Sequence, residues 1–200
     1  SLNMLGSTPV AAYSAAGKIE QILTQAYVAH GTAMANYSAQ NVGAGDIPRI
    51  RQGFRAATIW GSVYSVAAGV LIMTVGKYLT YLFVSEDAAM LLDSVDLYLK
   101  CIGFFFIPLN IVNAYRNGLQ GLGYGLLPMT AGVAELAGRG VIAVISARYS
   151  SYFGICMAGP AAWVLAGGLL VVLYFYIVKK DLPRTLAKRK EHGMQFLEER

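Results

Sequence analysis

Charged side chains are scarce in this sequence. Asp, Glu, Lys and Arg make up only 14% of the chain, whereas an average soluble domain has about 25%. Apolar residues fill the difference, because they account for 56% of the chain. This balance excludes an ordinary soluble domain. The formal net charge of +5 does not indicate nucleic-acid binding, since the basic residues lie between or after the apolar runs.

Cysteine is also rare. Cys101 and Cys156 both fall inside apolar runs, so we expect small core residues and not a disulfide framework. No Cys and His residues have metal-ligand spacing, and no Ser, His and acid could meet within one bilayer leaflet. The glycine-rich stretches lack the Gly-Lys-Ser/Thr ending of a phosphate-binding loop. We therefore expect neither an enzyme nor a bound metal or cofactor.

Long uncharged runs are the main feature of what is present. Residues 56–76 and 149–178 contain no Asp, Glu, Lys or Arg. Residues 21–45 also lack these four residue types and contain one histidine. A helix needs about 20 apolar residues to cross a bilayer. Three runs are long enough, and the regions around 92–118 and 124–147 also qualify if a few charges are tolerated. The sequence therefore predicts an all-α integral membrane protein with five transmembrane helices.

The distribution of basic residues predicts the orientation of these helices. We expect them over about 9–42, 53–83, 91–118, 124–148 and 152–178. Basic residues favour the cytoplasmic side, and they gather after the first, third and fifth helices. We therefore expect residues 1–178 to form one transmembrane bundle, with loop 43–52 and a basic tail, 179–200, in the cytoplasm.

A stripe of polar side chains runs along the first predicted helix. It consists of Lys18, Gln21, Thr24, Gln25, Thr32 and Asn36, which lie within roughly a 120° arc at about 100° per residue. Lipid offers such groups no hydrogen bonds, so the stripe must face protein or a wet cavity. Contact between helices and a water-filled cavity both stay open, and we expect the stripe to face the bundle interior. His30, on the other side, is expected to be a packing residue.

The third predicted helix has a narrower polar face. Its members are Asn110, Asn113, Asn117 and Gln120. Pro108 lies just before them, removes a backbone donor and frees the carbonyl of Phe104, so we expect a bend. Bends beside polar side chains recur where transporters bind substrate. A kink stabilised by amide contacts to a neighbouring helix is the alternative.

Glu135 and Arg139 stand four residues apart in otherwise uncharged surroundings. Burying one such charge alone costs on the order of 2.5–3.5 kcal/mol on insertion scales, and pairing reduces that cost. Small residues on the same face, Ala131 and Gly138, let another helix approach closely. We expect the pair to contact each other or one adjacent helix, away from lipid. It is either a structural clamp or a substrate- or proton-coupled site, and Glu135 is expected to be the only acid near the middle of the membrane.

Two stretches resemble the multidrug and toxic compound extrusion (MATE) family. The first is AAYSAAGKIEQILTQAYVAHGTAMANYSAQNVGAGDIPRIRQG, which ends like the second helix of each MATE half before a basic cytoplasmic loop. The second is NAYRNGLQGLGYGLLPMTAGVAELAGR, which is similar to the junction of the fourth and fifth helices of a half. The matching motif positions are Gln40, Asn41, Gly43, Ala44, Arg116 and Gly118. The resemblance covers about residues 1–180.

The resemblance implies a fold and a function. MATE proteins have twelve helices in two six-helix lobes, and five helices with a basic tail match most of the C-terminal lobe. The chain would then be a partial sequence, with residues 1–8 ending the seventh helix and the N-terminal lobe of the same polypeptide as its partner. The implied activity is export of drugs or organic cations across the cell (inner or plasma) membrane. It would be coupled to H⁺ or Na⁺ antiport by alternating access.

The sequence departs from one branch of the family and leaves two alternatives. That branch has an Asp in the tenth helix, whereas FFFIPLNIVNAYRNGLQG contains no acid, so the resemblance does not carry that cation site over. Flippases of lipid-linked precursors or polysaccharides share the architecture. A structural or assembly membrane protein is the alternative from another class, although it would not need polar stripes on two helices.

Overall fold

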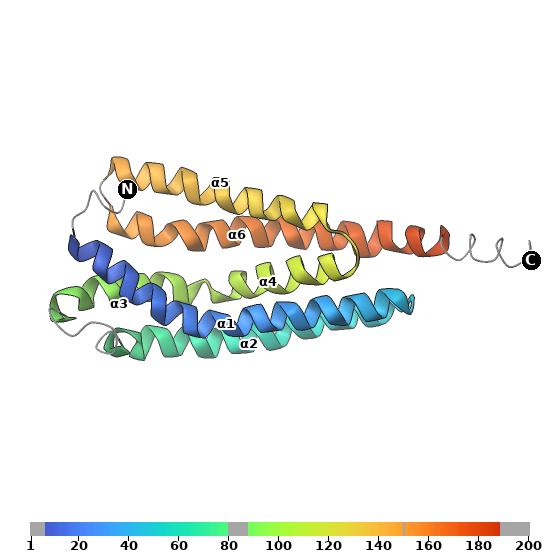
Figure 1. Cartoon of the computed structure of the whole chain (residues 1–200), viewed down its shortest axis with the longest axis horizontal. Coiled ribbons are helices and arrows are strands. Elements are labelled where there is room, and N and C mark those ends of the chain that lie inside the picture. The colour runs from blue at the N-terminus through green and yellow to red at the C-terminus, as the bar shows by residue number, and fades with distance from the viewer. Residues whose placement is uncertain (1–6, 80–87, 150, 189–200) are drawn as a thin grey trace, which may run out of the picture.

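The structure, a computed structural model, describes residues 7–79, 88–149 and 151–188 and is all-α over these ranges, as predicted. The helices are α1 (Ser7–Gly43), α2 (Ile47–Leu79), α3 (Ala88–Phe104), α4 (Phe106–Gly121), α5 (Leu126–Arg148) and α6 (Tyr152–Tyr176). They lie side by side in one elongated bundle (Figure 1). Most of the segment expected to end a seventh helix, residues 1–6, lies outside the described residues, as do 80–83 of the second predicted helix and 189–200 of the tail.

Within the described ranges, three helices are long and apolar enough to cross a membrane. They are Ile47–Gly76, Leu126–Arg148 and Tyr152–Lys188, and the bent pair Leu92–Phe104 and Phe106–Gly121 makes a fourth span if it counts as one. The long helix α1 is not among these spans, because its polar stripe lowers its hydropathy. It lies against α2 and α4, so packing and not composition sets its place in the bundle.

The third predicted helix is not continuous. It breaks at Phe105 into α3 and α4, which meet at a bend of 51°. The predicted bend is therefore confirmed, and it separates the predicted span into two helices. Pro108 cannot donate to the carbonyl of Phe104, and it falls in the first turn of α4, where a missing backbone donor is harmless. At the break, the Phe105 amide donates to the Ile102 carbonyl at 2.9 Å.

Small residues allow α4 to pack tightly against α1 and α2. A Cβ added at Gly121 would lie 2.2 Å from the carbonyl oxygen of Ala35 on α1, and one at Gly61 of α2 would meet the side chain of Asn110. Around these contacts lie fully buried large side chains, including Tyr27, Phe54 and Phe106. By contrast, α5 packs mainly on α6 and touches α4 at few positions. It is therefore the outer helix of the bundle (Figure 1).

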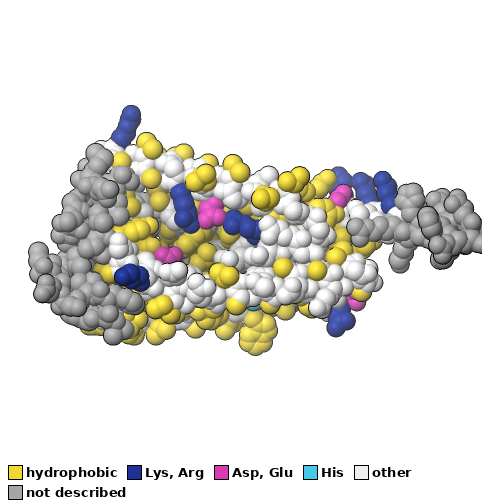
Figure 2. Space-filling view, viewed as in Figure 1, with side chains coloured by type: hydrophobic (Ala, Val, Ile, Leu, Met, Phe, Trp, Pro, Cys, Tyr) yellow, Lys and Arg dark blue, Asp and Glu magenta, His cyan; other side chains and the backbone are white. Residues whose placement is uncertain are grey.

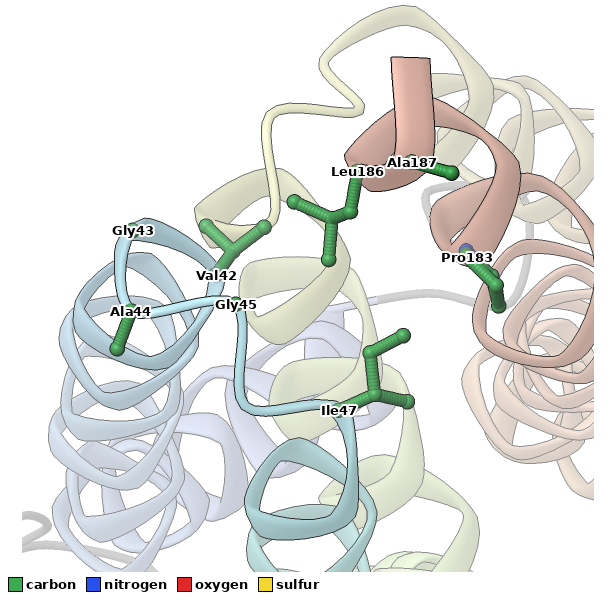
Figure 3. Close-up of a pocket in the computed structure, with 8 residues that line it drawn as sticks. All are labelled: Val42, Gly43, Ala44, Gly45, Ile47, Pro183, Leu186 and Ala187. Carbon is green, nitrogen blue, oxygen red and sulfur yellow. The ribbon is translucent and has the colours of Figure 1, made fainter. Parts of the chain in front are cut away.

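The last helix continues past the predicted boundary at residue 178. It passes through a π-helical turn, η3 (Ile177–Asp181), and runs on to residue 188, with Leu182 buried. This extension borders a groove of about 450 Å³ opposite the turn between α1 and α2. Figure 3 shows Leu186 and Val42 lying toward one another across it.

Candidate functional site

Two arginines hold the carboxylate of Glu135. Nη2 of Arg139, one turn further along α5, donates to Oε1 at 2.8 Å. Nη2 of Arg116, on α4, donates to Oε2 at 2.8 Å. The Glu135 side chain is only 18% exposed, compared with 28% for Arg116 and 48% for Arg139. Both carboxylate oxygens therefore have charged partners, and the ion pair extends across two helices.

The contact between Glu135 and Arg139 is present as the sequence predicts, whereas the role of Arg116 was missed. Sequence reasoning placed Arg116 only at a helix end, as part of a family motif. A usable signal was nevertheless present. Between Lys100 and Arg139 the only charged residues are Arg116 and Glu135. An acid in such a stretch needs the one base within it, because unpaired charges are costly in an apolar bundle.

A second acid lies close to this cluster. Oε2 of Glu20 on α1 accepts a hydrogen bond of 2.6 Å from the hydroxyl of Tyr98 on α3. Glu20 and Arg139 also line the same cavity of about 100 Å³, with Trp163 of α6 on its wall. Glu20 is therefore a second acid beside the charged cluster, which the sequence analysis did not single out. Glu20 was missed because it lies off the polar stripe of its helix.

Arg139 connects these charged groups, because it binds Glu135 and lines the same cavity as Glu20. Figure 2 shows basic and acidic side chains side by side near the middle of this face, within a mainly hydrophobic and uncharged surface. The two carboxylates, Glu20 and Glu135, balance the two guanidinium groups, Arg116 and Arg139. The cluster is therefore formally neutral when all four groups are ionised.

The polar stripe of α1 does not face the bundle interior, so that prediction is wrong. Gln21, Gln25, Thr32 and Asn36 are all exposed. The opposite face of the helix carries the buried side chains, including Ile19, Tyr27 and Met34. The apolar face packs against α2 and α4, because burying apolar side chains is more favourable than burying the polar stripe. The stripe is left on the outside of the described bundle.

The asparagines of α4 do lie inward. Asn110 is fully buried, and Nδ2 of Asn117 packs at the position where Gly31 of α1 has no side chain. Asn113 and Asn117 donate to carbonyls of their own helix, those of Leu109 and Asn113 respectively. Gln120 is exposed. These amides contact α1 and α2, whereas Arg116 turns toward α5, so the structure does not gather all the predicted site residues in one place.

The motif residues at the end of α1 form a turn. Nδ2 of Asn41 donates to the Tyr37 carbonyl at 2.8 Å, and the amide of Ala44 donates to the Gln40 carbonyl at 3.1 Å. Gly45 has φ +71°, a conformation that favours glycine, and Gly43 is exposed just before it. On α4, a Cβ at Gly118 would lie 2.6 Å from the Phe54 ring. These positions therefore shape the backbone and the packing.

His30 has a structural partner. Its Nε2 lies 3.2 Å from the carbonyl oxygen of Ala57 on α2, which agrees with the expected packing role. Within the part of the chain that the structure describes, no group of three or more His, Cys, Asp or Glu side chains could hold a metal ion.

The sequence of this chain is similar to that of known proteins. The family model MatE matches residues 1–145. The "Probable multidrug resistance protein YpnP" of Bacillus subtilis (strain 168) is 33% identical over 118 residues, which cover 59% of this chain. The match spans about a quarter (26%) of that relative, and no solved structure matches significantly. Because the family model covers more than half of the chain, the chain belongs to the multidrug and toxic compound extrusion (MATE) family.

Proposed function

We propose that this chain forms most of the C-terminal lobe of a secondary active transporter, not an enzyme, that exports drugs or organic cations by cation-coupled antiport. The observation that carries the proposal is the cluster of Glu135 with Arg116 and Arg139 in an apolar bundle. Charges inside a membrane bundle are costly and mark substrate or ion pathways. Membership of the MATE family and the similarity to a probable multidrug resistance protein of Bacillus support a drug-exporting activity.

The exposed stripe of α1 supports a partner on that face. Gln21, Gln25, Thr32 and Asn36 would be unfavourable against lipid, which cannot satisfy their hydrogen bonds. The N-terminal lobe of the same polypeptide would cover them, with a wet pathway for a small organic substrate between the lobes. Asn110, Asn113 and Asn117 then belong to the inner packing of the lobe near its bend, where they contribute to the pathway indirectly.

The proposed orientation places loop 43–52 and the tail in the cytoplasm of a multi-pass cell-membrane protein. Arg49 and Arg51 follow the turn after α1, and Lys179 and Lys180 follow α6. Both regions lie at the same end of the bundle (Figure 1). An excess of basic residues at one end favours the cytoplasmic side.

The proposed activity can be tested with the complete transporter in bacterial cells that lack their main efflux pumps. Tetraphenylphosphonium, a lipophilic cation, serves as the probe. Expression should lower its accumulation several-fold, and collapse of the H⁺ and Na⁺ gradients, one at a time, should identify the coupling ion. Equal accumulation with and without the transporter, for this probe and for a panel of drugs, would overturn the proposal.

A further inference from the structure

The two acids of the charged cluster are held in different ways. Both oxygens of Glu135 accept hydrogen bonds from guanidinium groups, at 2.8 Å each. Protonating Glu135 would therefore leave two arginines facing a neutral group. Glu20 instead receives its hydrogen bond from the neutral hydroxyl of Tyr98. Its protonation leaves every ion pair of Glu135 in place, so Glu20 can change charge with less disturbance.

The surroundings of Glu20 allow its carboxyl group to bind and release a proton. The titratable or charged groups that line its cavity are Tyr13 on its own helix, Tyr98 on α3, Arg139 on α5 and Cys156 on α6. Arg139 is close enough to interact electrostatically with the Glu20 carboxylate. The cavity of about 100 Å³ has room for a few water molecules, each of which occupies about 30 Å³ in the liquid. Water can therefore carry the proton to and from the carboxyl group.

We propose that Glu20 is the proton-exchanging carboxylate of this lobe, and that Glu135 remains a fixed ion pair. The O–H bond of the Glu20 carboxyl breaks, its proton passes to water, and the carboxylate remains hydrogen-bonded to Tyr98 beside Arg139. This inference rests on the proposed transport function and assigns H⁺ as the ion exchanged at this site.

Charge balance links this proton to a cationic substrate. With Glu20 ionised, the two carboxylates and the two guanidinium groups sum to zero. With Glu20 protonated, the cluster carries one net positive charge, which repels an organic cation at the same face of the lobe. Binding of a monovalent cation therefore favours the ionised form of Glu20 and releases one proton. Exchange of one proton for one cation follows from this competition.

Proton release on binding tests the assignment. Tetraphenylphosphonium is added to the purified, complete transporter in weakly buffered detergent solution that contains a pH indicator. The wild type should release about one proton per bound cation. Glu20→Gln should bind the cation more weakly, because its cluster keeps the net positive charge, and at saturating cation it should release at least tenfold fewer protons per bound cation. Asp96→Asn is the matched control, because it alters an acid of α3 that is paired with Lys100 at 2.6 Å. It should release protons as the wild type does.

The possible outcomes separate this inference from the proposed function. Undiminished release by Glu20→Gln, or release abolished only by Glu135→Gln, would overturn the assignment of Glu20. If Glu20→Gln fails to fold, Glu20→Asp keeps the carboxyl group and should keep release. A wild type that neither binds nor exports any cation overturns the transport proposal instead. In that case, acid–base titration of the wild type and of Glu20→Gln still tests Glu20, because equal proton uptake by the two would overturn the assignment.

Discussion

Arg116 donates a hydrogen bond of 2.8 Å to Glu135 across the interface between α4 and α5. Few other contacts join these two helices. The pair of Arg116 and Glu135 is therefore a main link between α4 and α5. The carboxylate is also bonded to Arg139, but that bond lies within α5. The two arginines should therefore differ in their contribution to stability.

We predict that Arg116→Gln lowers the stability of the bundle more than Arg139→Gln does. A hydrogen bond to a charged group contributes about 1.5–3 kcal/mol, and Arg116 is 28% exposed. Arg139 is 48% exposed, and exposed pairs four residues apart in a helix contribute about 0.3–0.5 kcal/mol. Thermal unfolding in detergent measures both effects. Equal losses in the two variants would show that the link between the helices adds nothing.

Contacts between residues that are close in the sequence can be predicted from the sequence, whereas contacts between distant helices cannot. The pairing of Glu135 with Arg139 follows from their spacing of four residues, and the bend follows from Pro108. Arg116 and Glu135 are 19 residues apart, and Glu20 and Tyr98 are 78 apart. Those contacts depend on which helices pack together. Periodicity likewise shows which polar residues of α1 share a face, but not which neighbour covers that face.

We predict that Gly121→Ala destabilises the bundle. The added Cβ would meet backbone atoms of Ala35, at 2.2 Å from the oxygen and 2.8 Å from the carbonyl carbon. Since backbone cannot rotate away, α1 and α4 must separate, and overpacking of this kind costs about 1–3 kcal/mol. The matched control is Gly132→Ala in α5, where no atom lies within 4 Å of the new Cβ. It should be neutral or stabilising by up to about 1 kcal/mol. A similar melting temperature for both variants would contradict the close approach.

Tyr124 should make stability depend on alkaline pH. It lies in the turn between α4 and α5, and its hydroxyl donates to Oδ2 of Asp181 at 2.5 Å. Burial, followed by the bond to the Asp181 carboxylate, raises the pKa of Tyr124 from 10.0 to about 12. Between these values the folded chain keeps a proton that the unfolded chain loses, so stability falls as pH rises through this window.

The measurement for Tyr124 is the melting temperature in detergent as the pH is raised from 9 to about 12. Tyr124→Phe should show a smaller fall than the wild type, because it has no proton to lose at this position. Tyr149→Phe is the control, since that side chain is 79% exposed and the variant should keep the wild-type fall. An equally steep fall in the Tyr124 variant would rule out this contribution.

The exposed stripe of α1 should contact water in the complete transporter. A cysteine in place of Gln25 should react with a charged, membrane-impermeant thiol reagent, because a polar stripe against lipid would lack hydrogen bonds. A cysteine in place of Val63, which is 56% exposed on the apolar surface of α2, should react far more slowly. The buried Cys101 and Cys156 give little background. Protection at position 25 together with reaction at position 63 would contradict the pathway on the α1 side.

Pro108→Ala should straighten the break between α3 and α4. The new amide can donate to the Phe104 carbonyl, which Pro108 leaves without its helical partner, so one continuous helix becomes favourable. Spin labels at the exposed positions Leu97 and Gln120 lie on opposite sides of the 51° bend. The distance between the two labels should lengthen in the variant. Transport of tetraphenylphosphonium should slow, because bends of this kind serve as substrate sites or moving joints in transporters.

Pro128→Ala is the control, since Pro128 lies in the first turn of α5, where the amide has no helical partner. An unchanged distance in the Pro108 variant would show that packing against α1 and α2, and not the proline, holds the bend.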